Sequence, residues 1–187
     1  MSLLAELRTA TRAAHDRLES RLDVLAHCRT TTQYAALLAG FRSVYAPLEQ
    51  ALDASPLTTA AVPDWAQRRK TAWLDADLHE LGALAPPVPA AAAPASRAEV
   101  LGAVYVMEGA TLGGALVVRS LRSAFAAPPP HRFFDSYGTR RGAMWAAFRR
   151  SADGLAVAPA PAVAAALRTF AAVEAACLER PATGTAA

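Results

Sequence analysis

Hydrophobic residues recur at helical spacing along most of the chain. Residues 104–119 show the pattern best, since their large apolar residues repeat on a period of about 3.6 residues and no proline interrupts them. These residues are Val104, Met107, Leu112 and Leu116. The first segment has a similar apolar face, formed by Leu4, Leu7, Ala14, Leu18 and Leu25. No segment alternates as a half-buried strand does. The pattern predicts an all-α bundle of five or six helices.

Capping signals and prolines set the expected limits of these helices. The motifs Thr30-x-x-Gln33 and Ser96-x-x-Glu99 are capping boxes, which mark helix starts, and Pro63 suits a first helical turn. We expect helices at residues 2–26, 30–54, 63–82, 96–125, 140–154 and 161–180. Residues 83–95 are rich in Ala and Pro and predict a linker, and residues 131–139 predict a loop with aromatic side chains.

Length and composition favour a globular cytoplasmic protein. A chain of 187 residues with 53% hydrophobic residues forms one domain with a sizeable core, expected over residues 1–180, with a disordered tail at 181–187. No apolar run reaches the length of a membrane span, about 18 residues, and the first residues lack a signal-peptide pattern. Cys28 and Cys177 have no metal-ligand spacing, which predicts free thiols.

The net charge is +3 and the isoelectric point is about 9.2. Lys70 is the only lysine, and no basic run with interleaved aromatic residues occurs. Nucleic-acid binding is therefore not expected, whereas a basic surface could dock an acidic protein.

The helix expected at 96–125 contains glycines where a helix former would be more stable. An interior glycine costs about 1 kcal/mol relative to alanine. Gly109 and Gly113 are four residues apart and share one face, and Gly102, seven residues earlier, joins them. A bare stripe permits a close helix–helix crossing, or the close approach of a flat ligand to the backbone. The glycines alone leave both interpretations open.

A polar stripe on the first helix supplies a candidate opposite wall. Arg8, Arg12, His15 and Glu19 are spaced four, three and four residues apart and lie at the edge of the apolar face. Neutral imidazole is a common metal ligand, Glu19 could accept a hydrogen bond from it, and the arginines could bind carboxylates of a bound group. A solvated helix face explains the same charges without a ligand.

Several motifs together resemble the heme oxygenase family. They are ELRTATRAAHDRLE (6–19), YVMEGATLGGALV (105–117), FFDSYGTRRGAMWAAF (133–148), WLDADLHELG (73–82) and TFAAVEAACL (169–178). The bacterial branch that makes biliverdin for bacteriophytochromes is the most similar. The resemblance covers most of the chain, and it depends on the order and spacing of motifs that are individually weak.

The resemblance implies a site between the first helix and a glycine-bent distal helix. His15 corresponds to the heme-iron ligand and Glu19 to its supporting carboxylate. Arg8, Arg12 and Arg149 correspond to bases that reach the heme propionates. Gly109 and Gly113 correspond to the backbone beside the bound oxygen, and Tyr105 lines the pocket. His27, His79 and His131 match no family ligand and are expected at the surface.

The implied activity is opening of the heme ring by O2 to give biliverdin, iron and CO. Heme is both substrate and cofactor. Because the chain has no dinucleotide fingerprint or P-loop, electrons are expected from a ferredoxin or flavoprotein reductase. Many family members carry Asp after the first distal glycine, whereas this chain has Ala110. Glu108 is adjacent but points about 100° away on an ideal helix, so water held by the backbone is the favoured proton route.

Two other functions remain open at this point. The first is a non-catalytic heme-binding or heme-delivery protein that keeps His15 and has lost turnover through Ala110. The second is a thiaminase-like hydrolase with Cys28, beside His27, as a nucleophile, although no carboxylate partner for it is evident in the sequence.

Overall fold

The computed structural model describes residues 2–84, 87 and 89–178, and the expected tail at 181–187 lies outside them. The longer helices are α1 (Leu3–Arg21), α2 (Thr31–Asp53), α4 (Thr71–Glu80), α5 (Arg97–Ala124), α7 (Arg141–Asp153) and α8 (Pro159–Leu178). The short elements are η1 (Ala26–Arg29), α3 (Pro56–Ala61), η2 (Trp65–Gln67), α6 (Arg132–Asp135) and η3 (Gly138–Arg140). No strand occurs in this described part, so the all-α prediction is confirmed.

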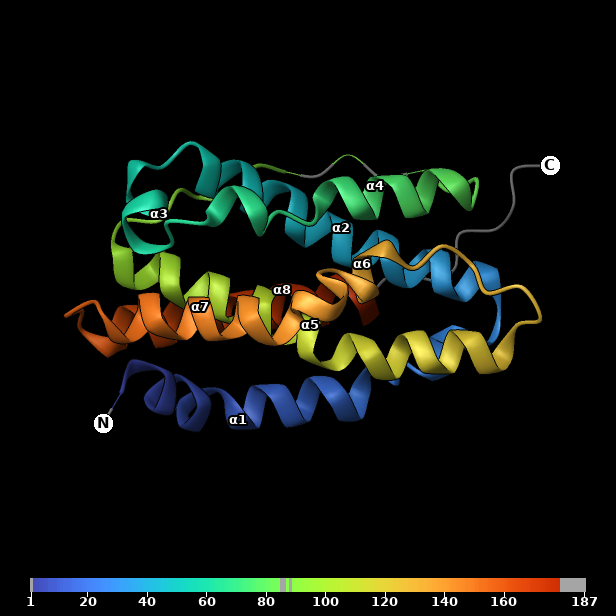
Figure 1. Cartoon of the computed structure of the whole chain (residues 1–187), viewed down its shortest axis with the longest axis horizontal. Coiled ribbons are helices and arrows are strands. Elements are labelled where there is room, and N and C mark those ends of the chain that lie inside the picture. Colours follow the sequence, from blue (N-terminus) through green and yellow to red (C-terminus); the bar gives the residue numbers. More distant parts are fainter. Residues whose placement is uncertain (1, 85–86, 88, 179–187) are drawn as a thin grey trace.

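The helices form a layered bundle (Figure 1). Helix α8 packs against α1, α2 and α5, and its contact with α5 is the most extensive in the fold. Helices α2, α3 and α4 lie on one side of α5 and α7, and α1 lies on the other (Figure 1). Because α1 packs mainly on α8 and α7, the face of α5 beside it is not covered by an extensive helix–helix contact.

Three expected helices form nearly as predicted. The Ser96 hydroxyl accepts from the Glu99 N–H at 3.2 Å and starts α5, and the Thr30 hydroxyl accepts from the Gln33 N–H at 3.2 Å and starts α2. Helix α7 matches the range 140–154 to within one residue at each end. The starts of α2 and α5 follow local capping signals, which explains why the sequence predicts them well, whereas no side chain caps the start of α7.

The first expected helix is too long. Helix α1 ends at Arg21, and residues 26–29 form the separate turn η1. The side chain of Asp23 accepts from the Ala26 N–H at 3.0 Å, and its carbonyl accepts from the Ala26 and His27 N–H groups. An aspartate that binds nearby backbone N–H groups competes with helix continuation.

The expected helix at 63–82 is wrong in its first half. The chain instead forms α3, η2 and only then α4 from Thr71. The carboxylate of Glu49 on α2 accepts from the N–H groups of Lys70 and Thr71 and fixes the start of α4. The residues before it turn inward, and Arg68 and Lys70 are completely buried. A tertiary contact therefore overrides the local helix signal.

Two further expectations need correction. Residues 131–139 contain the helical turns α6 and η3 rather than an open loop, because Phe133 packs on Phe41 and Tyr45 of α2. The last helix begins at Pro159, two residues before the expected start, and the described part of the chain ends at Leu178.

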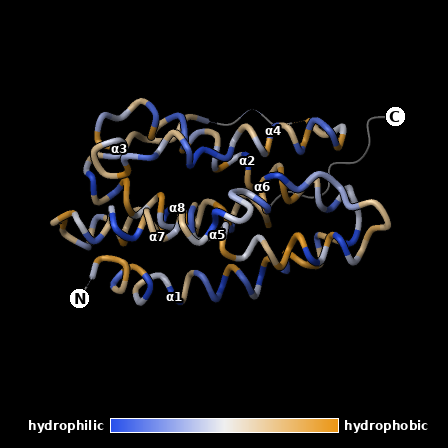
Figure 2. The backbone as a smooth tube through the Cα atoms, viewed as in Figure 1, coloured by the Kyte–Doolittle hydropathy of each residue, from blue (hydrophilic) through white to orange (hydrophobic). Residues whose placement is uncertain are grey.

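Helices α5 and α8 are long and apolar enough, by length and composition only, to cross a membrane. The sequence contains no uninterrupted apolar run of that length, as expected, but the mean hydropathy of an 18-residue window in each of these two helices is high enough. The most apolar window of α5 is 61% buried, and hydrophobic residues recur along this helix (Figure 2). The corresponding window of α8 is 44% buried, and the two helices bury apolar residues against each other.

Candidate functional site

The imidazole of His15 lies on the outer face of α1, beside two carboxylates. Its Nδ1 atom is 3.6 Å from Glu19 Oε2 and 3.7 Å from Asp16 Oδ1, and half of the side chain is exposed. A carboxylate beside one ring nitrogen favours a proton there, which leaves the lone pair on Nε2 available to a metal. The ring packs edge-on against Phe170 of α8 at 6.0 Å between centroids. Asp16 and Phe170 are partners of His15 that the sequence analysis missed.

The same cluster offers more than one way to hold a metal. Ligand atoms of His15, Asp16 and Glu19 lie within 4.8 Å of one another. All three residues are exposed, which is common for acidic surface groups that bind no ion. Within the described residues, this arrangement fits an imidazole ligand with carboxylate support at least as well as a site for a bare cation.

An ionic contact also holds helix α1 on α8. Glu174 of α8 accepts from Arg17 Nε at 3.0 Å and from Arg21 Nη1 at 2.6 Å. These hydrogen bonds, with Arg17 contributing most, lower the pKa of the Glu174 carboxyl. Charge-assisted bonds of this kind fix orientation, so they set the rotation of α1 and the direction in which His15 faces. The sequence analysis did not identify this pair.

The three candidate propionate-binding arginines are exposed and do not contact one another. Arg12 lies 3.6 Å from Asp16, whereas Arg8 and Arg149 have no hydrogen bond or ion pair to any residue that the structure describes. Figure 1 places the beginning of α1 and the end of α7 at the same end of the bundle, and these helices are in contact. Arg8 and Arg12 are thus exposed on the first half of α1, and Arg149 is exposed in the last turns of α7, which contacts α1.

The glycines of α5 divide into two groups. A Cβ atom built on Gly102 would lie 2.0 Å from the Ala162 carbonyl oxygen, and one on Gly114 would lie 2.1 Å from that of Phe134. Gly102 shares a helix face with Gly109 and Gly113 by spacing but not their surroundings: the interpretation as a close helix–helix crossing holds for Gly102, which lies at the α5–α8 contact. A Cβ on Gly109 or Gly113 meets nothing within 4 Å.

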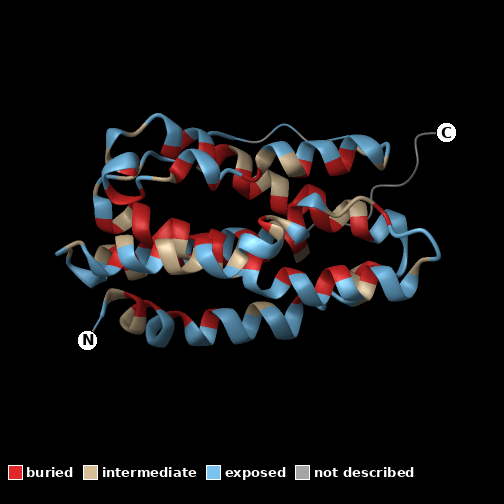
Figure 3. Cartoon of the chain, viewed as in Figure 1, coloured by how far each residue is buried: buried red, intermediate tan, exposed pale blue. Residues whose placement is uncertain are grey.

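The open glycines share their face with exposed leucines. Leu112 and Leu116 are 45% and 62% exposed, and with Gly109 and Gly113 they follow the helical spacing of one face. Figure 3 shows this exposure along the second half of α5. The apolar face expected for residues 104–119 is correspondingly split, since Val104 and Met107 are in the core whereas the two leucines are outside it. A face with no bulk at two positions and apolar side chains at two others fits a large flat apolar group.

Tyr105 lies partly buried one turn before Gly109. Its ring is 6.2 Å from that of Trp145 on α7, which in turn packs on Phe148 at 5.7 Å. Trp145 precedes Arg149 by one turn, so the aromatic pair connects the glycine helix to the helix that carries a candidate propionate-binding residue. The sequence analysis did not assign a role to Trp145.

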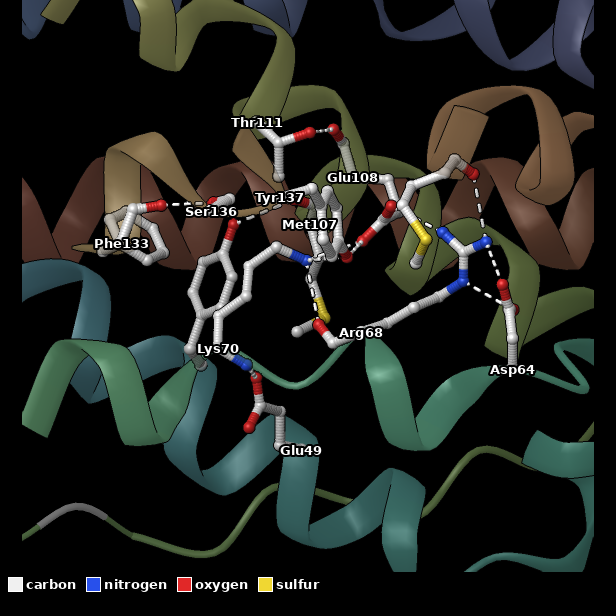
Figure 4. A network of polar contacts seen from close by, with 12 residues as sticks. Glu49, Asp64, Arg68, Lys70, Met107, Glu108, Thr111, Phe133, Ser136 and Tyr137 are labelled. Atoms are coloured by element: carbon white, nitrogen blue, oxygen red, sulfur yellow. Dashed lines mark hydrogen bonds and ion pairs between the residues drawn. The ribbon is translucent and has the colours of Figure 1, made fainter. Parts of the chain in front are cut away.

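Glu108 lies in the core, and the idea that it contacts a ligand directly is not supported. Its carboxylate is 1% exposed and binds Arg68, Lys70 and Tyr137 (Figure 4). Ala110, in contrast, is exposed beside the open glycines. Nothing in the local sequence pattern indicates that Arg68 and Lys70 turn inward while Arg69 between them stays exposed.

The remaining histidines and cysteines do not form a second site. His79 is exposed as expected, whereas His27 and His131 are half-buried and contact backbone carbonyl groups through Nδ1. Cys28 is buried, and burial raises the pKa of its thiol to about 11. A thiol that stays protonated is a poor nucleophile, which argues against the hydrolase alternative.

Solved structures with the same arrangement are all-helical heme oxygenases. The heme oxygenase of Neisseria meningitidis has a TM-score of 0.82 at 18% identity, covering 96% of this chain and 92% of that one. Heme oxygenase 2 of Chlamydomonas reinhardtii, solved without heme, has a TM-score of 0.81 at 23% identity, with coverage of 99% and 100%. Heme oxygenase-1 of Synechocystis in complex with heme has a TM-score of 0.74 at 17% identity, with coverage of 96% and 92%.

Sequence comparison assigns the family as well as the fold. No curated protein matches the sequence significantly, but the heme oxygenase family model matches residues 1–176. The chain therefore belongs to the heme oxygenase family, whose members bind heme.

Proposed function

We propose that this chain is a catalytic heme oxygenase, which binds heme between α1 and α5 and converts it to biliverdin, iron and CO. The observation that carries the proposal is the open face of α5, where a Cβ on Gly109 or Gly113 has no neighbour within 4 Å. Within this family, backbone that is free of side chains on the distal helix leaves room for a small molecule between the helix and the heme.

Each candidate residue has a role in this arrangement that its surroundings support. His15 would supply the nitrogen ligand to the heme iron, and Glu19, 3.6 Å from Nδ1, orients the ring. Arg8, Arg12 and Arg149 bind the propionates, since guanidinium groups pair well with carboxylates. Tyr105 closes one side of the pocket through its contact with Trp145.

Heme supplies the redox chemistry and is itself the molecule that is cleaved. On one side of the heme the chain would contribute His15 as a neutral ligand. On the other side it would contribute the α5 backbone at Gly109 and Gly113, where there are no side chains. Gly109 and Gly113 hold water and O2 close to their backbone groups. Ala110 offers no side chain for proton transfer, so water bound to the α5 backbone delivers protons. Electrons come from a ferredoxin or flavoprotein reductase.

The non-catalytic alternative, heme binding or delivery, shares His15 and the fold and differs only in turnover. Addition of heme should give a Soret band at one equivalent, and reductant with O2 should then convert that band to a bilin spectrum with release of CO. A stable Soret band that persists through reduction and reoxygenation would identify a heme-delivery protein. Failure to bind heme would exclude both functions.

The cellular setting follows from the same assignment. We propose that the chain acts in the cytoplasm, since its two most apolar helices pack against each other within the bundle. We further propose that it supplies biliverdin to a bacteriophytochrome, because its motifs resemble those of the bacterial enzymes with this role. Transfer of the bilin product to an apo-bacteriophytochrome, followed by the absorbance of the assembled photoreceptor, tests this partner directly.

A further inference from the structure

We infer that Glu108 is a positioning residue, which holds the Gly109–Gly113 segment of α5 in place from the core side through Arg68, Lys70 and Tyr137. The inference rests on the proposed function, in which this segment forms the distal wall of the heme site. Figure 4 shows the four side chains meeting in the interior.

The Glu108 carboxylate is fully committed to partners on other elements. Its Oε2 accepts from Arg68 Nη1 at 2.6 Å, and its Oε1 accepts from Lys70 Nζ at 2.6 Å and from Tyr137 Oη at 2.7 Å. Arg68 and Lys70 precede α4, and Tyr137 lies between α6 and η3. One carboxylate therefore ties α5 to two separate parts of the chain.

The cationic partners are equally well satisfied. Lys70 Nζ donates to Glu108, to the Arg68 carbonyl at 2.9 Å and to Tyr137 Oη at 3.1 Å, which uses all of its protons. Arg68 donates to both carboxylate oxygens of Asp64 at 2.7 Å and to the Met144 carbonyl on α7 at 3.0 Å. The two cations therefore pair with the carboxylates of Glu108 and Asp64, and the nearby buried carboxylate of Glu49 binds the Lys70 and Thr71 N–H groups.

Stability alone does not account for such a cluster. Replacing a buried ion pair by apolar side chains of similar size is often neutral or stabilising, because desolvation offsets the attraction between the charges. Directional hydrogen bonds also define how the elements that they join are positioned. Here they define the position of α5 at Glu108, the residue that directly precedes Gly109.

The glycine segment has particular need of this support. Neither Gly109 nor Gly113 has a side chain, and nothing lies within 4 Å of the Cβ position at either residue, so no contact at these positions restrains the helix from the open side. Glycine also lowers helix stability. On the core side, the Met107 carbonyl accepts from Tyr45 Oη at 3.3 Å, and the Glu108 carbonyl accepts from Thr111 Oγ1 at 2.7 Å. These bonds and the Glu108 cluster restrain the segment at its first turn.

The test compares three variants with one control. Glu108→Gln removes the charge. Tyr137→Phe removes the hydrogen bond that Tyr137 donates to Glu108 and the one that it accepts from Lys70, and it leaves both ion pairs of Glu108. The combined variant Arg68→Met, Lys70→Met, Glu108→Leu replaces the two cations and the Glu108 carboxylate by apolar side chains, keeps Asp64 and Tyr137, and is expected to fold. Asp77→Asn is the control, because Asp77 is a fully buried carboxylate that binds Arg132 and the Phe133 N–H instead.

The first measurement is amide hydrogen exchange of the heme-free protein. Exchange at residues 109–113 should become tenfold or more faster in Glu108→Gln and in the combined variant, and a few-fold faster in Tyr137→Phe. Asp77→Asn should leave these amides unchanged relative to the rest of α5. Unchanged exchange at 109–113 in both the combined variant and Tyr137→Phe would overturn the inference, and this result does not depend on heme turnover.

The second measurement is the C–O stretching band of the ferrous CO complex, which reports the surroundings of the distal ligand. The combined variant should bind heme within about threefold of the wild-type affinity, because α1 is untouched, but should show a shifted or broadened band. A wild-type band in the combined variant would mean that the cluster serves folding only. If the wild-type chain binds no heme, the proposed function fails, while the exchange result still decides the role of Glu108.

Discussion

Gly114 and Phe134 approach each other so closely that a Cβ atom at position 114 would lie 2.1 Å from the Phe134 carbonyl oxygen. The neighbouring Gly113 has nothing within 4 Å of the same position. Two adjacent glycines therefore serve different purposes, one in helix packing and the other at an open face. The contrast provides a matched pair of substitutions.

Gly113→Leu should leave the fold intact and slow or abolish ring opening. The added side chain gains about 0.5 kcal/mol in helix propensity and projects into open space, where it fills the site next to the distal backbone. Heme should still bind through His15. Thermal unfolding and single-turnover bilin formation, measured on one preparation, check this expectation.

Gly114→Ala should have the opposite effect, with lower stability and little change in turnover. Its methyl group meets the Phe134 backbone, and overpacking of this kind costs roughly 1–3 kcal/mol. Turnover per folded molecule should stay near that of the wild type. If instead Gly113→Leu is destabilised and turns over normally, Gly113 serves packing and the assignment of the open face is wrong.

His15→Ala should abolish turnover and remove the wild-type Soret band, because His15 is the only protein ligand that we assign to the iron. Free imidazole should restore much of the spectrum by occupying the space left by the side chain. The control is His79→Ala, which removes an exposed histidine on α4. Wild-type spectrum and activity in His15→Ala would exclude this residue as the ligand.

Arg8→Ala, Arg12→Ala and Arg149→Ala should each weaken heme binding or change the biliverdin isomer formed. A hydrogen bond to a charged group contributes about 1.5–3 kcal/mol, which corresponds to about tenfold or more in affinity. Heme titration and chromatography of the bilin product measure the two effects. Arg122→Ala is the control for loss of charge, since it lies at the other end of the molecule, near the end of α5 (Figure 1). Three variants with unchanged affinity and isomer would remove these arginines from the site.

Stability should decrease as the pH rises above about 9, in part because of the buried thiols. Burial raises the pKa of Cys28 to about 11 and that of Cys177 to about 12 in the folded chain, from an ordinary value of 9.0. Below pH 9 both states keep the proton and the full stability is present. Between about pH 9 and 11 the unfolded chain releases protons that the folded chain retains, which favours unfolding.

Denaturant unfolding at several pH values, in the wild type and in Cys28→Ala, measures this dependence. The variant should show a weaker decline above pH 9. In the native state at pH 8, both thiols should react with a disulfide reagent only at the rate of unfolding. Rapid reaction of either thiol in the folded protein would contradict its burial.

Much of the helical framework follows from local signals in the sequence. Ser96 and Glu99 predict the start of α5, and Thr30 and Gln33 predict the start of α2, because a capping hydroxyl satisfies N–H groups only a few residues away. The stripe that contains His15 and Glu19 is predicted in the same way, since helical spacing alone places the two side chains together. The family motifs then suggest what this stripe binds.

Tertiary structure decided how residues with the same local pattern are used. Gly102, Gly109, Gly113 and Gly114 are alike in the sequence, and only the positions of α8 and α6 determine which of them face another backbone and which face open space. In the sequence, Arg68 and Lys70 resemble surface cations. In the fold, hydrogen bonds to Glu108 and Tyr137 offset the free-energy cost of burying their charges. Local spacing determines which side chains share a helix face, whereas the free energy of burying a charge or a bare backbone depends on atoms that are distant in sequence.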